Sequence, residues 1–213
     1  MLYRTTTTTV VTGALLAGCS AAPPVELSED AVEAARTCFV AKGLTLREDK
    51  AQDDAVTYDE FVASIRYPMI AAAERDDFAM STVIDILNGT ENVAETLGAQ
   101  DYAGAAATCN ERFPGEPLAL PESDSGAILA CTAMASFVAG AIEGESDDFG
   151  GDGAKISALQ ERLGTALEGD AELLMALAGG EGEALMMSQL RTAFAQGDPD
   201  GYIDRCDARF PVQ

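Results

Sequence analysis

The stretch Cys109-Asn-Glu-Arg-Phe-Pro114 decides the fold of this chain, because it recurs as Cys206-Asp-Ala-Arg-Phe-Pro211 close to the end of the sequence. Each copy has an earlier cysteine at nearly the same distance upstream, Cys38 for the first and Cys131 for the second. A closing motif that repeats together with its opening cysteine indicates a duplicated module. Cys19 is the fifth cysteine and belongs to neither copy.

The amino terminus has the composition of an export signal. A single cation, Arg4, is followed by an uncharged stretch that ends in Leu16-Ala17-Gly18-Cys19. One cation, an apolar run and small residues before a cleavage point indicate a signal segment, which is set aside when the fold is considered. The ending resembles the lipobox of bacterial lipoproteins, a family in which the signal is cut before the cysteine and the thiol is acylated. An ordinary secretory signal, with Cys19 as a free thiol, is the alternative.

The lipobox resemblance implies where the mature chain would lie. Residues 1–18 would be the signal peptide, Cys19 the lipidation site for acyl chains such as palmitate, and residues 19–27 a tether above the lipid surface. More than one acyl chain would make the membrane anchoring stable. Ser20 follows the cysteine, which by analogy with enteric lipoproteins favours the outer membrane over the inner. The expected location is the bacterial cell envelope, facing the periplasm.

The remaining four cysteines predict two disulfides. An exported chain enters an oxidising compartment, where an even number of cysteines indicates a disulfide framework. Four cysteines allow three pairings, and the duplication selects Cys38 with Cys109 and Cys131 with Cys206. A zinc site is disfavoured, because no two of the four cysteines lie in a short loop and the chain contains no histidine.

The mature chain is expected to be all-α. Apolar residues recur at three- and four-residue steps, as in Ile156, Leu159, Leu163 and Leu167, and no comparable segment alternates with a period of two. We predict two tandem modules of about four to five helices each, with a disulfide closing each module. Module 1 covers 28–114, the proline-rich linker 115–123 and module 2 124–213. The expected helices are 28–43, 57–77, 78–87, 90–97, 101–113, 125–142, 154–167, 171–178, 183–195 and 201–210.

One segment resembles the calcium-binding loop of EF-hand proteins. Counted from Gln196, residues Asp198, Asp200, Asp204 and Asp207 occupy ligand positions three, five, nine and twelve of that loop. The first and last positions depart from it, since Gln196 replaces an acid and Asp207 is shorter than the usual Glu. The alternative is a turn whose acids cap the last helix. We therefore assign no metal and no cofactor, and keep these four acids as a calcium candidate.

The sequence offers no recognisable catalytic constellation. Without histidine, a serine or cysteine nucleophile lacks its commonest base, and neither a Gly-x-Ser-x-Gly elbow nor a phosphate-binding glycine loop occurs. Arg112 and Arg209 occupy the final turns of their helices, where cations suit the helix dipole. With 36 acids against 13 bases and a net charge of −23, nucleic acid is disfavoured as a partner.

These observations lead to one preferred function and two alternatives. The preferred one is a non-enzymatic binding or adaptor lipoprotein of the envelope, bound to the membrane through its lipid and to another envelope protein. A periplasmic carrier or sequestering protein for a small ligand or cation is the second, and an enzyme of unrecognised type the third. The groove between the two modules is the expected place for a partner or an apolar ligand.

Overall fold

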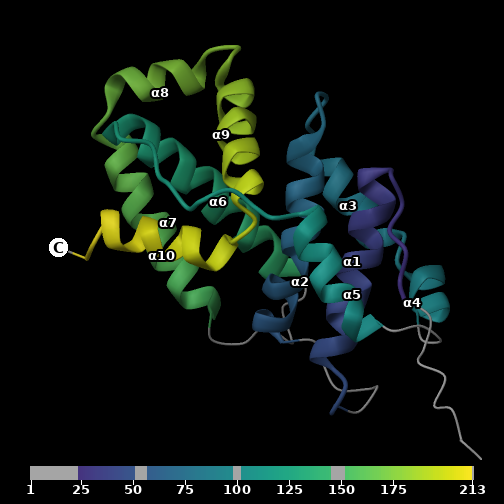
Figure 1. Cartoon of the computed structure of the whole chain (residues 1–213). Helices are drawn as coiled ribbons and strands as arrows, with labels where there is room; N and C mark the ends of the chain where they lie inside the picture. Colours follow the sequence, from purple (N-terminus) through teal and green to yellow (C-terminus); the bar gives the residue numbers. More distant parts are fainter. Residues whose placement is uncertain (1–23, 51–56, 98–101, 145–151, 213) are drawn as a thin grey trace, which may run out of the picture.

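The computed structural model describes residues 24–50, 57–97, 102–144 and 152–212, which form ten α-helices and no strand (Figure 1). The prediction of an all-α protein is confirmed, and each expected helix corresponds to one in the structure, with its ends shifted by a few residues. The proposed signal peptide and Cys19 lie outside the described residues. The helices are α1 (Ala31–Leu46), α2 (Tyr58–Glu74), α3 (Met80–Asn88), α4 (Glu91–Leu97), α5 (Tyr102–Arg112), α6 (Asp124–Gly144), α7 (Asp152–Glu168), α8 (Ala171–Ala178), α9 (Gly182–Gln196) and α10 (Pro199–Arg209).

Side-chain caps fix where the first two helices begin. Asp30 is the N-cap of α1, and its carboxylate accepts a hydrogen bond from Glu33 N at 3.0 Å. The sequence predicts this cap at Ser28, whose hydroxyl instead accepts from Asp30 N at 3.1 Å. In α2, Thr57 and Glu60 form a capping box, in which each side chain accepts from the backbone N–H of the other. Free amides at both helix starts are thereby satisfied.

Both predicted disulfides are present. Cys38 in α1 is bonded to Cys109 in α5, and Cys131 in α6 is bonded to Cys206 in α10, with a Cα–Cα distance of 5.6 Å in each case. The bonded cysteines are 71 and 75 residues apart in sequence, and all four are buried. We call α1–α5 the first half and α6–α10 the second half.

Helix α2 belongs to the hydrophobic cores of both halves. Tyr67 and Ile70 pack with α1 and α5 around Cys38–Cys109, whereas Ile65, Met69 and Ala72 pack with α6, α7, α9 and α10 around Cys131–Cys206. The duplication predicts that each module buries its helices around its own disulfide. The structure differs because α2 is apolar on two faces and is buried along almost its whole length.

The segment between the halves is held against α9 by backbone and side-chain hydrogen bonds. Glu116 N donates to Ala195 O at 2.8 Å. Ala119 exchanges two bonds with Gln196, since Ala119 N donates to Oε1 at 2.9 Å and Nε2 donates to Ala119 O at 3.1 Å. In Figure 1 this segment runs from the end of α5 past α9 to the start of α6. The two halves are therefore joined by fixed contacts.

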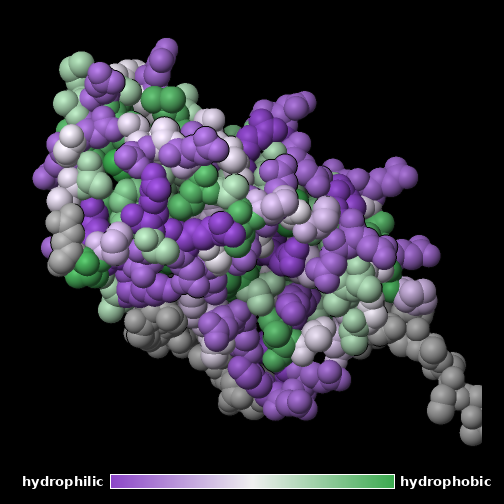
Figure 2. Space-filling model, turned by 60° about the vertical axis from the view of Figure 1, so that its left-hand side comes forward, coloured by the Kyte–Doolittle hydropathy of each residue, from purple (hydrophilic) through white to green (hydrophobic). Residues whose placement is uncertain are grey.

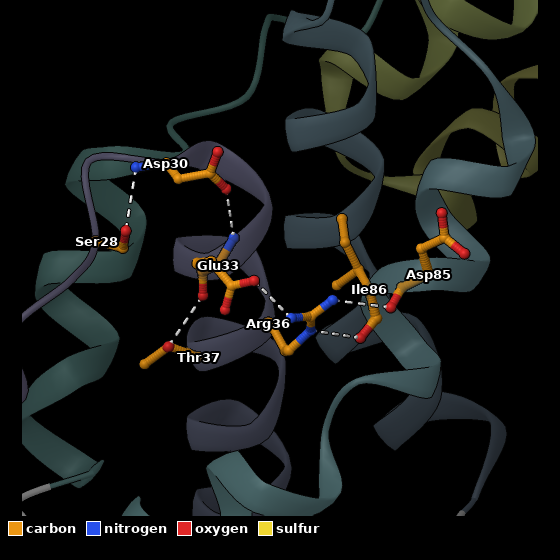
Figure 3. A network of polar contacts seen from close by, with 7 residues as sticks. All are labelled: Ser28, Asp30, Glu33, Arg36, Thr37, Asp85 and Ile86. Carbon is orange, nitrogen blue, oxygen red and sulfur yellow. Dashed lines mark hydrogen bonds and ion pairs between the residues drawn. The ribbon is translucent and has the colours of Figure 1, made fainter.

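Arg36 ties α1 to the end of α3 (Figure 3). Its guanidinium donates to Glu33 in its own helix at 2.7 Å, to Asp85 O at 3.1 Å and to Ile86 O at 3.4 Å. Those two carbonyls lie in the last turn of α3, where a cation is favoured. A Cβ added to Gly89 would lie 2.3 Å from this guanidinium, so glycine makes room for it.

The chain begins to pack earlier than the predicted tether of 19–27 allows. Val25 is buried, and Leu27 packs against the first-half core, although both fall within that segment. The part of the segment which the structure describes is thus docked on the first half. Val25 and Leu27 pack on the first half because their side chains are apolar.

By length and composition alone, helix α6 could cross a membrane. Among the helices that the structure describes, no other meets these criteria. Half of its apolar window is buried inside the protein, and Cys131 bonds it to α10. A core helix of a globular protein has the same composition. On the face drawn in Figure 2, hydrophilic residues predominate around smaller hydrophobic groups.

Candidate binding site

A cavity of about 330 Å³ lies where the first half meets the turn between α9 and α10. We call it the junction cavity. Helices α1, α2 and α5 form one side, and the α9–α10 turn forms the other. Its lining residues are Lys42, Val62, Ala63, Arg66, Tyr67, Ala106, Asn110, Gln196, Gly197, Asp198 and Pro199.

Arg66 is held at the wall of the cavity by the end of α5. Its Nη2 donates to Phe113 O at 3.3 Å and to Pro114 O at 3.5 Å, and its guanidinium lies 5.4 Å from the ring centre of Tyr67. Its Nη1 and its buried Nε make no hydrogen bond with the described residues. The side chain is thus positioned by carbonyls and an aromatic ring, without a carboxylate.

Tyr67 sets the orientation of the Asn110 amide. The Tyr67 hydroxyl donates to Asn110 Oδ1 at 3.2 Å. Burial raises the pKa of this phenol, which therefore stays neutral and keeps its proton for donation, although the Arg66 charge acts in the opposite direction. Because Oδ1 is the acceptor, the Asn110 group left to meet a ligand is its Nδ2 amide, a donor.

The opposite wall is the turn from α9 to α10. Gln196 is buried, and both ends of its amide are occupied by Ala119. Gly197 follows in the left-handed region at φ 64°, where a Cβ would lie 2.5 Å from Ile70 Cδ1. Asp198 then caps α10 by accepting from Gly201 N at 2.9 Å. This wall is consequently rigid and already hydrogen-bonded.

Two further hollows occur in the described part of the chain. The larger, about 690 Å³, is an open groove between α7 and the carboxyl end of α10, and its two cations, Arg162 and Arg209, are paired with Asp207 and Asp124. The smaller, about 170 Å³, lies beside Tyr58 and is lined by Asp59, Asp200, Asp204 and Lys155. Each of these hollows has its cations already matched by acids.

Three of the calcium candidates, Asp200, Asp204 and Asp207, lie in helix α10, and Asp198 is its N-cap. Residues 199–209 form α10, so the chain does not wrap around a central point as a calcium loop does. No group of three or more metal-binding side chains is found among the described residues. Each candidate acid has a separate partner: Asp198 the amide of Gly201, Asp200 the hydroxyl of Tyr58, Asp204 the ammonium of Lys155, and Asp207 the guanidinium of Arg162.

The two repeated arginines are both engaged in ion pairs. Arg112 contacts Glu74 at 3.1 Å and lies over the ring of Phe113 at 4.6 Å, whereas Arg209 contacts Asp124 at the start of α6. Each occupies the last turn of its helix, as a stabilising cation would.

The sequence did not single out Lys42 and Arg66. Neither has an acid three or four positions away in its own helix, but the same is true of Arg112, Arg162, Arg191, Arg205 and Arg209. Arg162 nevertheless finds an acid on another helix, so only tertiary packing distinguishes the junction cavity. Comparisons with protein-family models, with curated proteins and with solved structures found no match for this chain.

Proposed function

We propose that this chain is a lipid-anchored protein of the bacterial cell envelope that acts by binding, without covalent chemistry. The observation that carries the binding role is the junction cavity, which has the size of a small-molecule site and carries unpaired donors on its α1, α2 and α5 wall. The two disulfides support an oxidising compartment. The lipobox-like ending at Cys19 supports the lipid anchor. The anchored protein would lie on the periplasmic side of the membrane.

The proposal includes a tandem architecture, with module 1 over 28–114 and module 2 over 124–213. It is supported by the order of the parts, because in each half the disulfide joins the first long helix to the last one. The near-equal separations of 71 and 75 residues also support it. In this proposal, α2 lies between the two copies and packs in both cores, so that the copies form one folded unit.

The cavity bears on the choice between the two binding functions. An adaptor for an envelope protein needs an exposed surface, and the exposed apolar residues Leu174, Met175 and Leu185 on α8 and α9 could contribute to one. A carrier needs a concave site with groups that a small ligand can bind, and the junction cavity supplies one. We therefore propose the small-ligand carrier as a function of equal rank with the adaptor. An enzyme of unrecognised type remains the third alternative.

The anchoring is tested by mass spectrometry of the mature amino terminus and by membrane fractionation. We expect the mature chain to start at an acylated Cys19 and to sediment with the outer membrane. The Cys19→Ser variant should keep its signal peptide or appear in the soluble periplasmic fraction. An unmodified Cys19 thiol on a mature, soluble protein would show that the chain is secreted without a lipid.

The adaptor role is tested by chemical cross-linking in intact cells, followed by purification in non-ionic detergent. One envelope protein should be recovered reproducibly, and substitution of Met175 by Glu on the exposed face of α8 should reduce its recovery. The matched control is Leu163→Met in the core, which leaves that surface unchanged. Recovery of no specific protein in either case would leave the carrier as the function.

A further inference from the structure

We infer that the junction cavity binds a small organic anion, with a carboxylate or phosphate held by Arg66 and Lys42 and a short apolar body against α2 and α5. This inference rests on the proposed binding function and names the chemical class of its ligand. Four observations carry it: an excess of cations, the absence of acidic partners for them, the predominance of free donors, and the apolar remainder of the wall.

The charge of the cavity is the reverse of the charge of the chain. Acids outnumber bases by 36 to 13 in the whole sequence, yet the cavity is lined by two bases, Lys42 and Arg66, and one acid, Asp198. That acid is occupied as the N-cap of α10. The cavity is therefore a local positive site, which attracts a ligand of opposite charge at short range.

Among the described cations, acidic partners are the rule. Lys42, Arg66, Arg191 and Arg205 have no carboxylate within ion-pair distance in the described part of the chain, whereas the others do. Arg191 donates to Ala73 O instead, and Arg205 is exposed on α10. The other two converge on one cavity.

The polar groups that remain free in the cavity are donors. Arg66 keeps its Nη1, Asn110 keeps its Nδ2, and the Lys42 ammonium makes no hydrogen bond or ion pair with the described residues. The amide of Gln196, by contrast, has both ends bonded to Ala119. Carboxylate and phosphate oxygens accept only, and charge-assisted bonds from guanidinium and ammonium groups hold them strongly.

The rest of the wall limits the size and character of the ligand. Val62, Ala63 and Ala106 supply an apolar lining between the donors. A volume of about 330 Å³ lies at the lower end of ligand sites in proteins. A carboxylate or phosphate with a short alkyl chain matches both features, whereas a polymeric anion does not fit.

The other two cavities serve as internal comparisons. The groove beside α10 has two arginines, but each is paired with an acid, and the hollow beside Tyr58 has three acids against one lysine. The groove is lined by two cations and one acid, as the junction cavity is, so cationic lining alone would make the two equally good anion sites. The junction cavity differs in that its cations lack acids, and this predicts where a ligand will bind.

The test is isothermal titration of the full-length, disulfide-bonded chain in non-ionic detergent with four probes of equal chain length: hexanoate, hexyl phosphate, hexanol and hexylammonium. We expect the two anions to bind and the alcohol and the amine not to bind. Lys42→Met and Arg66→Met should each weaken binding of both anions by roughly tenfold or more, since each removes a charge-assisted hydrogen bond. Arg205→Met is the matched control, because it removes one exposed cation away from the cavity, and its affinity should stay within about twofold of the parent.

The outcomes separate this inference from the proposed function. Equal binding of amine and anions, binding that Lys42→Met leaves unchanged, or no binding at millimolar probe overturns the anion site, and the anchoring and cross-linking results then stand by themselves. Arg66→Met also loses the contacts to Phe113 and Pro114, so if it does not fold, Lys42→Met alone decides. An unacylated Cys19 with intact anion binding would overturn the location and leave the ligand class standing.

Discussion

Gln196 and Ala119 are joined by a reciprocal pair of hydrogen bonds, 2.9 and 3.1 Å long, across 77 residues of sequence. The buried amide of Gln196 thereby acts as a backbone mimic for the linker, and it does so at the wall of the junction cavity. The contact fixes how the linker passes α9, and therefore how the two halves meet.

Removal of this amide should loosen the linker. Gln196→Ala is expected to lower the free energy of unfolding by about 1–2 kcal/mol, because two backbone groups lose their partner. Hydrogen exchange at the Ala119 amide should speed up as well. Gln189→Ala in the same helix is the control, since the Gln189 side chain makes no hydrogen bond with the described residues. Equal effects of the two substitutions would show that the contact adds nothing.

The disulfides should stabilise one cooperative unit. Replacement of Cys38 and Cys109 by serine, or of Cys131 and Cys206, is expected to cost roughly 4 kcal/mol in either case, from loops of similar length. Because α2 packs in both cores, urea unfolding should remain a single transition that either pair of substitutions shifts. Two transitions, each sensitive to one disulfide alone, would instead identify independently folding halves.

Glu60 should stabilise the protein at neutral pH. Its buried carboxylate contacts Lys50 at 2.6 Å and Arg47 at 3.6 Å, and the bond from Lys50 is the main reason that its pKa lies below 4.5. A carboxyl with a lowered pKa contributes stability above its unfolded value and loses it as the pH falls. Glu60→Gln is expected to cost about 1–2 kcal/mol at pH 7 and progressively less below pH 4.5.

The control for Glu60 is Glu74→Gln. Glu74 pairs with Arg112 at the surface, where both side chains reach water, so its loss should cost well under 1 kcal/mol. The two variants are compared by the midpoints of their urea unfolding transitions, measured at several pH values. A Glu60→Gln deficit that is the same at pH 3 and pH 7 would contradict the role of the charge.

Asp200 should lower the stability of the protein at neutral pH, in contrast to Glu60. Burial raises the pKa of this carboxyl above 3.8, helped by Asp59, Asp198 and Asp204, while the bond from Tyr58 works against the shift. Between the unfolded and the folded pKa, the folded state holds a proton that the unfolded state has lost, so stability falls as the pH rises. Relative to Asp200→Asn, the parent should therefore be less stable at pH 7 than at pH 4, as judged by urea unfolding.

Tyr58→Phe sharpens the Asp200 prediction. It removes the hydrogen bond that favours the ionised carboxylate, so the pKa of Asp200 should rise further, and NMR titration of the Asp200 carboxyl carbon measures it directly. A pKa that is unchanged or lower in this variant would show that the hydroxyl does not donate to Asp200.

Local patterns and the cysteine repeat predicted much of the fold. Apolar periodicity, the Thr57 cap and the prolines at 114 and 211 are properties of neighbouring residues, and so the helices could be located to within a few positions. The repeated motif selected one of three disulfide pairings, because two copies of one motif are expected to pair with their opening cysteines in the same way. The assignment of the α1 cap to Ser28 was wrong because Asp30 also suits that position.

The sequence by itself determined the helices and the excess of acid, which depend on residue type and short-range spacing, and the repeated motif determined the disulfide pairing. Only the tertiary structure decided that α2 serves both cores, that Asp198, Asp200, Asp204 and Asp207 have four different partners, and that Lys42 and Arg66 line one cavity. The physical reason is that pairing of charges and filling of cores depend on distances between residues dozens of positions apart. Such distances follow from how helices pack, which neither periodicity nor composition specifies.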